Sequence, residues 1–246
     1  MKHIAVIGAG NVASSLVPAL EALDGVSVVQ NWTRRSGEPL TSDADVYIMA
    51  VSDDAIAPLA DRFAGLNPGA LWLHTSGSVG MDALAPLGRR HGVFYPLQTF
   101  TRGRRLDFGD IPLFIEGSDP SVAGEMKELA ARLSRRVYDA DSSTRRAMHV
   151  AAVFACNFAN HLWSVADGLL RERSLSFDIL GPLLGETLTK ALESSPAEGQ
   201  TGPARRGDSR VMGEHIASLP PDLAEIYRVI SRHIINQYSS NEQDTL

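Results

Sequence analysis

The chain has little cysteine and no long apolar run, and each absence excludes a class of protein. One of its 246 residues is a cysteine, Cys156, so no disulfide can form within the chain. No cysteine and histidine spacing predicts a zinc site, so we expect no metal. No stretch reaches the roughly 18 apolar residues of a membrane-spanning helix, and the apolar run near the N-terminus is too short for a signal peptide. A cytoplasmic protein without a membrane partner is therefore expected.

Positive charge is also scarce. Lysine and arginine number 23 against 29 aspartate and glutamate residues, which gives a formal net charge of −6. Proteins that bind nucleic acid through its phosphates usually carry a basic surplus, so no nucleic-acid partner is expected. The composition, 44% apolar and 21% charged, is typical of a globular protein, and it favours a small-molecule partner.

The most informative stretch lies near the N-terminus, where the apolar residues 4–7 lead into the glycine turn of residues 8–13. Gly8 permits the tight turn, and Gly10 lets the backbone approach a pyrophosphate. The small Ala13 lets the following helix pack closely on the strand. Backbone N–H groups and the helix dipole favour phosphate at the helix start. The order of strand, glycine turn and helix predicts a dinucleotide site, and the alternative is a purely structural turn.

The next predicted strand, residues 26–30, is followed by Thr33, Arg34, Arg35 and Ser36. In NAD-binding folds an acidic residue about 20 residues beyond the glycines binds the adenosine ribose. Arginines and hydroxyls stand at that place here, and a guanidinium matches a 2′-phosphate bidentately. The pattern favours NADP over NAD, with two solvated arginines in a loop as the alternative.

Strand patterns and helical patterns alternate over the first 142 residues, which predicts a Rossmann-type, doubly wound and mostly parallel sheet. From about residue 143 the apolar spacing is helical only. We therefore assign residues 1–142 to an α/β dinucleotide-binding domain and residues 143–246 to an all-α domain. Besides the two strands above, strands are expected near residues 45–51, 71–74, 111–115 and 137–139, and residues 93–100 are expected to form one more strand and a proline-marked loop.

Two loops follow predicted strands at the sheet edge where ligands of such folds bind. Ser52 and Asp53 follow the third strand, and Thr75 and Ser76 follow the fourth. Ser52 and Asp53 are also good helix caps, so local capping is the alternative interpretation.

The helical half begins with a helix near residues 146–170 that is apolar on nearly every face. This pattern indicates burial against other helices or a second subunit. At helical spacing His149, Cys156 and Asn160 share one stripe, with Asn157 beside it. Polar groups on such a helix need partners, which can be a ligand or the neighbouring backbone.

The rest of the helical half is less informative. A helix is expected at about residues 178–194, and a long irregular segment at 196–208 is either functional or a flexible connection. Two more helices are expected after that segment. The polar tail, residues 239–246, is expected to be disordered.

Taken together, the chain resembles the Rossmann-like proteins that carry a C-terminal DUF2520 domain. That group lies within the wider 6-phosphogluconate dehydrogenase-like proteins, which include pyrroline-5-carboxylate reductases and F420-dependent NADP oxidoreductases. The resemblance covers nearly the whole chain and implies NADP binding by the first domain. It also implies a homodimer formed largely through the helical domain, and an active cleft between the domains. The matching segments are residues 7–13, 50–56, 74–78, 95–100, 149–157 and 201–208.

The chain departs from the hydroxyacid dehydrogenases of this superfamily, which use a lysine and an asparagine on the first helix of the second domain. Asn157 matches the asparagine, whereas Val153 stands in the place of the lysine. A lysine-driven alcohol oxidation is therefore not expected. Reduction of an imine needs only the hydride of the cofactor and one proton donor or a water. His149 is the best candidate donor, ahead of His74 and Tyr95, although each can equally be a structural residue.

The favoured interpretation is an NADP-dependent oxidoreductase that transfers a hydride between NADP(H) and a small imine or carbonyl metabolite bound between the domains. The alternative is a non-catalytic dinucleotide-binding or regulatory protein. The resemblance implies that residues 51–53 line the cofactor path and that the loop of residues 75–78 lies near the nicotinamide. The predicted catalytic residues are His149 and Asn157. The predicted cofactor-binding residues are Gly8, Gly10, Asn11, Val12, Thr33, Arg34, Arg35, Val51, Ser52, Asp53, Thr75 and Ser76.

Overall fold

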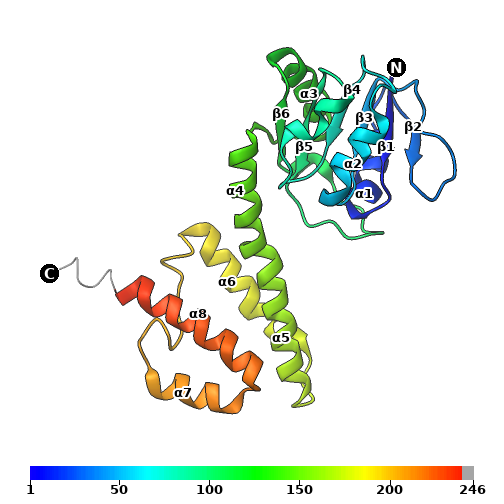
Figure 1. The fold of residues 1–246 in the computed structure, drawn as a ribbon. Helices are drawn as coiled ribbons and strands as arrows, with labels where there is room; N and C mark the ends of the chain where they lie inside the picture. Colours follow the sequence, from blue (N-terminus) through cyan, green and yellow to red (C-terminus); the bar gives the residue numbers. More distant parts are fainter. Residues whose placement is uncertain (240–246) are drawn as a thin grey trace. The chain divides into compact units, whose positions relative to one another are not determined.

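A computed structural model describes residues 1–239 (Figure 1). The chain divides into two compact units, Met1–Trp163 and Ser164–Leu246, and the division falls within helix α5 (Ala159–Arg171). The boundary predicted after residue 142 marks the change from sheet to helices, and as a domain boundary it stays a prediction. The tail predicted to be disordered lies, from residue 240 onward, outside the described residues.

The first unit is built around a sheet of β1 (Lys2–Ile7), β2 (Val26–Trp32), β3 (Val46–Met49), β4 (Leu71–His74), β5 (His91–Pro96), β6 (Leu113–Gly117) and β7 (Val137–Asp139). The strands lie in the order β2-β1-β3-β4-β5-β6-β7. Neighbours are parallel except β5 and β6, which are antiparallel. The predicted Rossmann-type, mostly parallel fold is confirmed, and each predicted strand is present.

Helices cover both faces of this sheet, and they are α1 (Asn11–Glu21), α2 (Asp53–Phe63), the 3₁₀ helix η1 (Met81–Leu87) and α3 (Pro120–Leu133). Successive side chains of a strand point to opposite faces. On β1, Ile4 and Val6 therefore pack with α1 and α3, whereas Ala5 and Ile7 pack with α2 and η1. Strands β3 and β4 are buried along their whole length, which places the core on both sides of the sheet centre.

After the sheet the chain is helical, with α4 (Ser142–Ala152), the π-helical turn η3 (Val153–Phe158), α5, η4 (Phe177–Leu180), α6 (Gly181–Glu193), α7 (Ser209–Ser218) and α8 (Pro221–Ser239). Helix α4 begins earlier than the predicted residue 146 because Asp141 caps it. The Asp141 carboxylate accepts a hydrogen bond from the Thr144 N–H at 2.7 Å. No helix within residues 1–239 combines the length and the apolar character needed to cross a lipid bilayer.

The helix predicted near residues 146–170 is not regular, because η3 interrupts it. A π-helical turn uses i→i+5 hydrogen bonds, so it shifts the angular position of every residue beyond it. The common stripe expected for His149, Cys156 and Asn160 assumed a regular α-helix and is therefore wrong. Such turns occur frequently at functional sites.

The helical segments bury few side chains within one chain. Among the described residues of the second unit, the buried ones are Ala204, Ala224 and Tyr238. Large apolar side chains of η3 and α5, predicted to be buried against other helices or a second subunit, are exposed; Phe154 is 66% exposed and Trp163 43%. Burial of these side chains against other helices or a second subunit stays a prediction.

Candidate active site

A cavity of about 780 Å³ lies where strands β1, β2 and β3 end and helices α1 and α2 begin. This is the carboxyl edge of the parallel strands, where open α/β sheets bind their ligands. Most of the predicted cofactor-binding residues line it, namely Gly8, Gly10, Asn11, Val12, Thr33, Arg34, Arg35, Val51 and Ser52.

The two glycines of the turn have different roles. Gly8 has a φ of +124°, and a Cβ placed on it would lie 2.2 Å from the carbonyl oxygen of Ala50. A Cβ on Gly10 would meet no protein atom within 4 Å, so the space beside Gly10 is open to the cavity. Gly8 therefore serves the fold, whereas Gly10 leaves room for a ligand to approach the backbone, as expected for a pyrophosphate.

The two helices that begin at the cavity lack a side-chain cap. Helix α1 begins after Gly10 and α2 after Ser52, and neither residue accepts a hydrogen bond through its side chain. By contrast, aspartates cap α3, α4 and α7 through their carboxylates. A cap satisfies the first N–H groups of a helix. The N–H groups at the starts of α1 and α2 thus remain available to an anion, which the helix dipole also favours.

The loop after β2 carries the predicted phosphate-binding arginines. The Trp32 indole donates a hydrogen bond to the Glu38 carbonyl at 2.8 Å, and this bond ties the loop to the end of the strand. The Ser36 hydroxyl donates to the Thr33 carbonyl at 2.7 Å within the same turn. Arg34 and Arg35 are exposed and line the cavity, as the sequence predicts.

A third arginine, Arg102, lines the same cavity and was not predicted. It belongs to the arginine-rich stretch of residues 102–105 in the loop between β5 and β6. The charged residues that line the cavity are all arginines, Arg34, Arg35 and Arg102, which suits a ligand with several phosphate groups.

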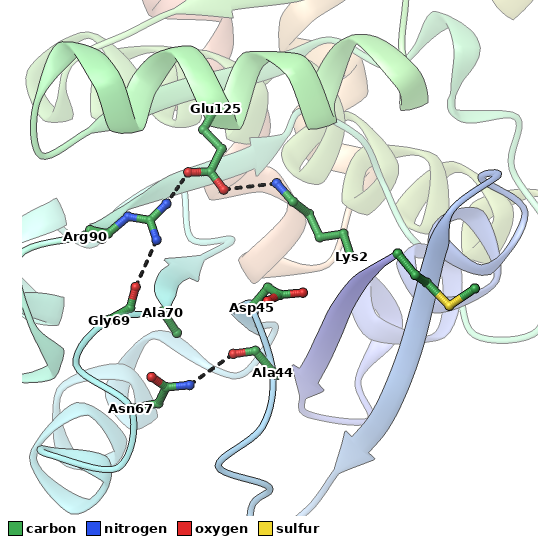
Figure 2. A pocket seen from close by; sticks show the side chains of 9 residues that line it. Lys2, Ala44, Asp45, Asn67, Gly69, Ala70, Arg90 and Glu125 are labelled. Atoms are coloured by element: carbon green, nitrogen blue, oxygen red, sulfur yellow. Dashed lines mark hydrogen bonds and ion pairs between the residues drawn. The ribbon is translucent and has the colours of Figure 1, made fainter.

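A second cavity, of about 540 Å³, lies near the amino ends of β1, β3 and β4 (Figure 2). Unlike the first cavity, it is lined by charged side chains of both signs. Glu125 of α3 points between two cations there. Its carboxylate pairs with Lys2 at 3.0 Å and also with Arg90, and Arg90 donates to the Gly69 carbonyl at 2.9 Å. Lys2 and Arg90 share the one carboxylate of Glu125, and the two ion pairs link α3 to β1 and to the residue before β5.

The predicted cofactor residues Asp53, Thr75 and Ser76 do not line the first cavity. Thr75 and Ser76 are buried, and their hydroxyls bond within the protein. The Thr75 hydroxyl donates to the Met49 carbonyl at 3.5 Å, and the Ser76 Oγ accepts from the Ser78 N–H at 3.0 Å. These bonds shape the loop after β4, and the predicted cofactor contacts of all three residues stay predictions.

The predicted donor His149 lies against the loop after β4. Its Nδ1 is 3.2 Å from the hydroxyl of Tyr95 on β5, and Gly77 packs against both rings. A Cβ on Gly77 would lie 2.7 Å from the His149 Nδ1 and 2.9 Å from the Tyr95 hydroxyl oxygen. Burial raises the pKa of Tyr95, and the charge of Arg145 opposes that rise. The phenol is therefore protonated at neutral pH, and the pair can hold a proton at the sheet edge.

The place of His149 depends on Arg145, one turn earlier on α4. Arg145 is fully buried, forms an ion pair with Glu116 of β6 and donates to the Val79 carbonyl at 2.6 Å. Glu116 also accepts from the Ser142 hydroxyl at 2.8 Å. These contacts fasten the first turn of α4 to the sheet.

His74, a weaker candidate donor, is fully buried at the end of β4. Its Nδ1 accepts a hydrogen bond from the Ser76 N–H at 3.1 Å. Burial, reinforced by the charge of Arg145, lowers the pKa of His74 to about 4. The ring is therefore neutral at physiological pH and carries no extra proton to donate, which makes His74 a weak candidate for the proton donor.

Asn157, the other predicted catalytic residue, lies in the π-helical turn η3. Its side chain is exposed, and it does not line the cavity at the glycine turn. A catalytic role for Asn157 stays a prediction.

Comparison with known proteins places this architecture. The family model described as a domain of unknown function, DUF2520, matches residues 111–234. A candidate NADP oxidoreductase from Bacteroides fragilis has a similar structure, with 37% identity, a TM-score of 0.89, and 96% of this chain and 98% of that one covered. The chain belongs to the DUF2520 family. The family resemblance predicted from the sequence is thereby confirmed.

More distant structures share the fold of this DUF2520 protein. An imine reductase from Streptomyces aurantiacus is 13% identical, with a TM-score of 0.67 over 99% of this chain and 95% of that one. An imine reductase from Myxococcus stipitatus in complex with NADP⁺ is 14% identical, with a TM-score of 0.61 and the same coverage of each chain. The curated proteins contain no match to the DUF2520 chain.

Proposed function

We propose that this protein is an NADP-dependent oxidoreductase that transfers a hydride between NADP(H) and a small imine or carbonyl metabolite. The observation that carries the proposal is the cavity at the glycine turn. It combines an open approach to Gly10, two uncapped helix starts and charged residues that are all arginines. These features together fit a phosphorylated dinucleotide.

The lining residues suggest how the cofactor would be held. The backbone from Gly10 to Val12 would bind the pyrophosphate, and Arg34 and Arg35 after β2 would bind the 2′-phosphate of the adenosine ribose. Val51 and Ser52 at the start of α2 would line the path toward the nicotinamide. The related protein from Bacteroides fragilis, named for NADP, supports this assignment.

The reaction needs one proton, and the Tyr95 and His149 pair is where the protein can hold it. When bound, NADPH would supply the hydride. Tyr95 carries a proton that its raised pKa retains, and His149 shares a hydrogen bond with that phenol. Donation from the pair to the substrate nitrogen or oxygen would complete the reduction. The two imine reductases with this fold make an imine the first acceptor class to test.

The alternative is a non-catalytic dinucleotide-binding protein, and apolar side chains that filled the nicotinamide position would favour it. Tyr95 and His149 do not line the cavity at the glycine turn, but they form a polar pair at the end of β5 beside Gly77. A pair that can hold a proton there supports the catalytic alternative. The expected substrate position between the two domains stays a prediction.

The proposal is tested by titrating the purified protein with NADPH and NADH, followed by fluorescence and by thermal unfolding. We expect tighter binding and stronger stabilisation by NADPH, and we expect the Arg34→Ala, Arg35→Ala double variant to lose that preference. Imine and carbonyl acceptors are then screened by the loss of NADPH absorbance. Absence of binding to either nucleotide would contradict the proposal, and binding without turnover of any acceptor would favour the non-catalytic alternative.

We also propose that a second copy of the chain covers exposed apolar side chains of α6. Leu183, Leu188 and Leu192 of α6 are 62%, 61% and 77% exposed, and Ile179 just before this helix is 60% exposed. Leu188 and Leu192 are four residues apart and share one face of the helix, whereas Leu183 lies on the opposite side. A symmetric dimer covers the face of Leu188 and Leu192 on both copies with the same contact, and obligate dimer interfaces are apolar in this way. A cytoplasmic location stays a prediction.

A further inference from the structure

The loop between β5 and β6, residues 97–112, is longer than its strands require. Antiparallel neighbours can be joined by two residues. The loop is held at two points, because Phe100 and Phe108 are buried in the core and their rings stack at 5.9 Å. The residues between these anchors, 101–107, form a segment that we name the arginine arch, because it contains Arg102, Arg104 and Arg105.

The arginine arch crosses helix α1, and the loop runs past this helix in Figure 1. Arg105 and Leu106 line a groove of about 580 Å³ together with Ser14, Pro18 and other residues of α1. Strands in a sheet are about 4.8 Å apart, so about 14 Å separates β5 from β1 across three spacings. A loop of this length spans that distance, since an extended chain advances about 3.3 Å per residue.

Arg102 lies three residues before Arg105 and lines the cavity at the glycine turn instead of the groove. In that cavity α1 contributes only its first turn, Asn11 and Val12. The arch therefore brings Arg102 to the cavity along α1, whereas Arg34 and Arg35 reach it from the end of β2. The left-handed φ of +81° at Gly103 turns the chain directly after Arg102.

We propose that Arg102 binds the pyrophosphate of the dinucleotide and straps the cofactor over the start of α1, an inference that rests on the proposed function. The uncapped α1 offers its first backbone N–H groups to the pyrophosphate, and Arg102 adds a guanidinium that can bind two phosphate oxygens. Arg34 and Arg35 bind the 2′-phosphate of the adenosine ribose in this proposal. Because NADP⁺ and NAD⁺ share the pyrophosphate, Arg102 raises the affinity for both without selecting between them.

The test is isothermal titration calorimetry of NADP⁺ and NAD⁺ binding to the wild type and to Arg102→Ala. We expect Arg102→Ala to weaken both affinities by about tenfold and to leave their ratio unchanged. Arg102→Lys retains the charge but loses the bidentate contact, so it should restore part of the affinity. Arg104→Ala, in the same arch but outside the cavity lining, is the matched control and should bind as the wild type does.

The possible outcomes separate this inference from the proposed function. A wild type that binds neither nucleotide overturns the proposed function and the strap with it. A wild type that binds NADP⁺ while Arg102→Ala keeps both affinities overturns the strap alone. Loss of NADP⁺ affinity only would place Arg102 at the 2′-phosphate and overturn the pyrophosphate assignment. Thermal unfolding of each variant without nucleotide establishes that the variants are folded.

Discussion

The sheet and the helices that follow it differ in where they place their apolar side chains. The sheet buries side chains on both faces, under α1 and α3 on one and α2 and η1 on the other. In the second unit, the buried residues among those described are Ala204, Ala224 and Tyr238, while leucines of α6 are more than half exposed. Burial of apolar surface is the main source of folding free energy. The sheet can therefore account for its own stability, whereas the described helices of the second unit bury little apolar surface of their own.

The largest effect is expected from charging the exposed face of α6. Leu188→Glu would place an unpaired charge twice in a symmetric dimer and cost about 6 kcal/mol or more of association free energy. We expect sedimentation equilibrium to show a dimer for the wild type and a monomer for the variant. Lys190→Gln changes the net charge by the same amount, and it breaks only the exposed pair with Glu186, so it should remain dimeric. A monomeric wild type, or a dimeric Leu188→Glu variant, would contradict the proposal that a second copy of the chain covers this face of α6.

The next largest effect is expected from the ion pair that links α4 to β6 of the sheet. Arg145→Met would leave Glu116 without its cation in a site where the arginine is fully buried. We expect a loss of about 3–5 kcal/mol in the free energy of unfolding, measured with urea. Arg146→Met, at the exposed neighbour on α4, is the control and should change stability by less than about 1 kcal/mol. Equal stabilities of the two variants would show that α4 does not need this ion pair.

Within the sheet unit, two glycines of one turn separate folding from binding. Gly8→Ala would force a Cβ against the Ala50 carbonyl oxygen at a left-handed φ, so we expect a loss of about 2–4 kcal/mol in stability. Gly10→Ala meets open space and should fold as the wild type does, while its methyl group weakens NADPH binding. Urea unfolding and a fluorescence titration of each variant measure the two effects. The assignment would be wrong if Gly10→Ala bound NADPH as tightly as the wild type.

The sheet unit is also easier to predict from the sequence than the helices that follow it. The strands and the glycine turn are predictable because their signals are local: an apolar run, a φ that favours glycine, and a helical spacing. The cavity lining after β2 is predictable for the same reason. The roles of Arg102 and Arg145 are not predictable in this way, because the sequence alone gives no reason to treat either arginine as more than a solvated charge. Only the fold brings Arg145 to Glu116 and Arg102 to the glycine turn. The π-helical turn has no comparable local signal, so regular spacing gave a wrong stripe for His149 and Cys156.

The smallest effect concerns pH, and it sharpens the contrast because it arises in the buried part of the molecule. His74 has a folded pKa of about 4 against 6.5 in the unfolded chain, since burial and the charge of Arg145 outweigh the opposing carboxylates of Asp53 and Glu116. Between pH 6.5 and pH 4 the unfolded chain binds a proton that the folded ring refuses, so stability falls as the pH falls. Above pH 6.5 the group contributes no pH dependence.

The expected loss from His74 between pH 6.5 and pH 5 is about 1.6 kcal/mol. In His74→Gln this part of the pH dependence should disappear, whatever the stability of the variant at neutral pH. Urea unfolding of both proteins at several pH values measures the two slopes. Parallel slopes would mean that His74 takes up its proton equally in both states, and that the end of β4 is more open to water than the buried ring in this structure requires.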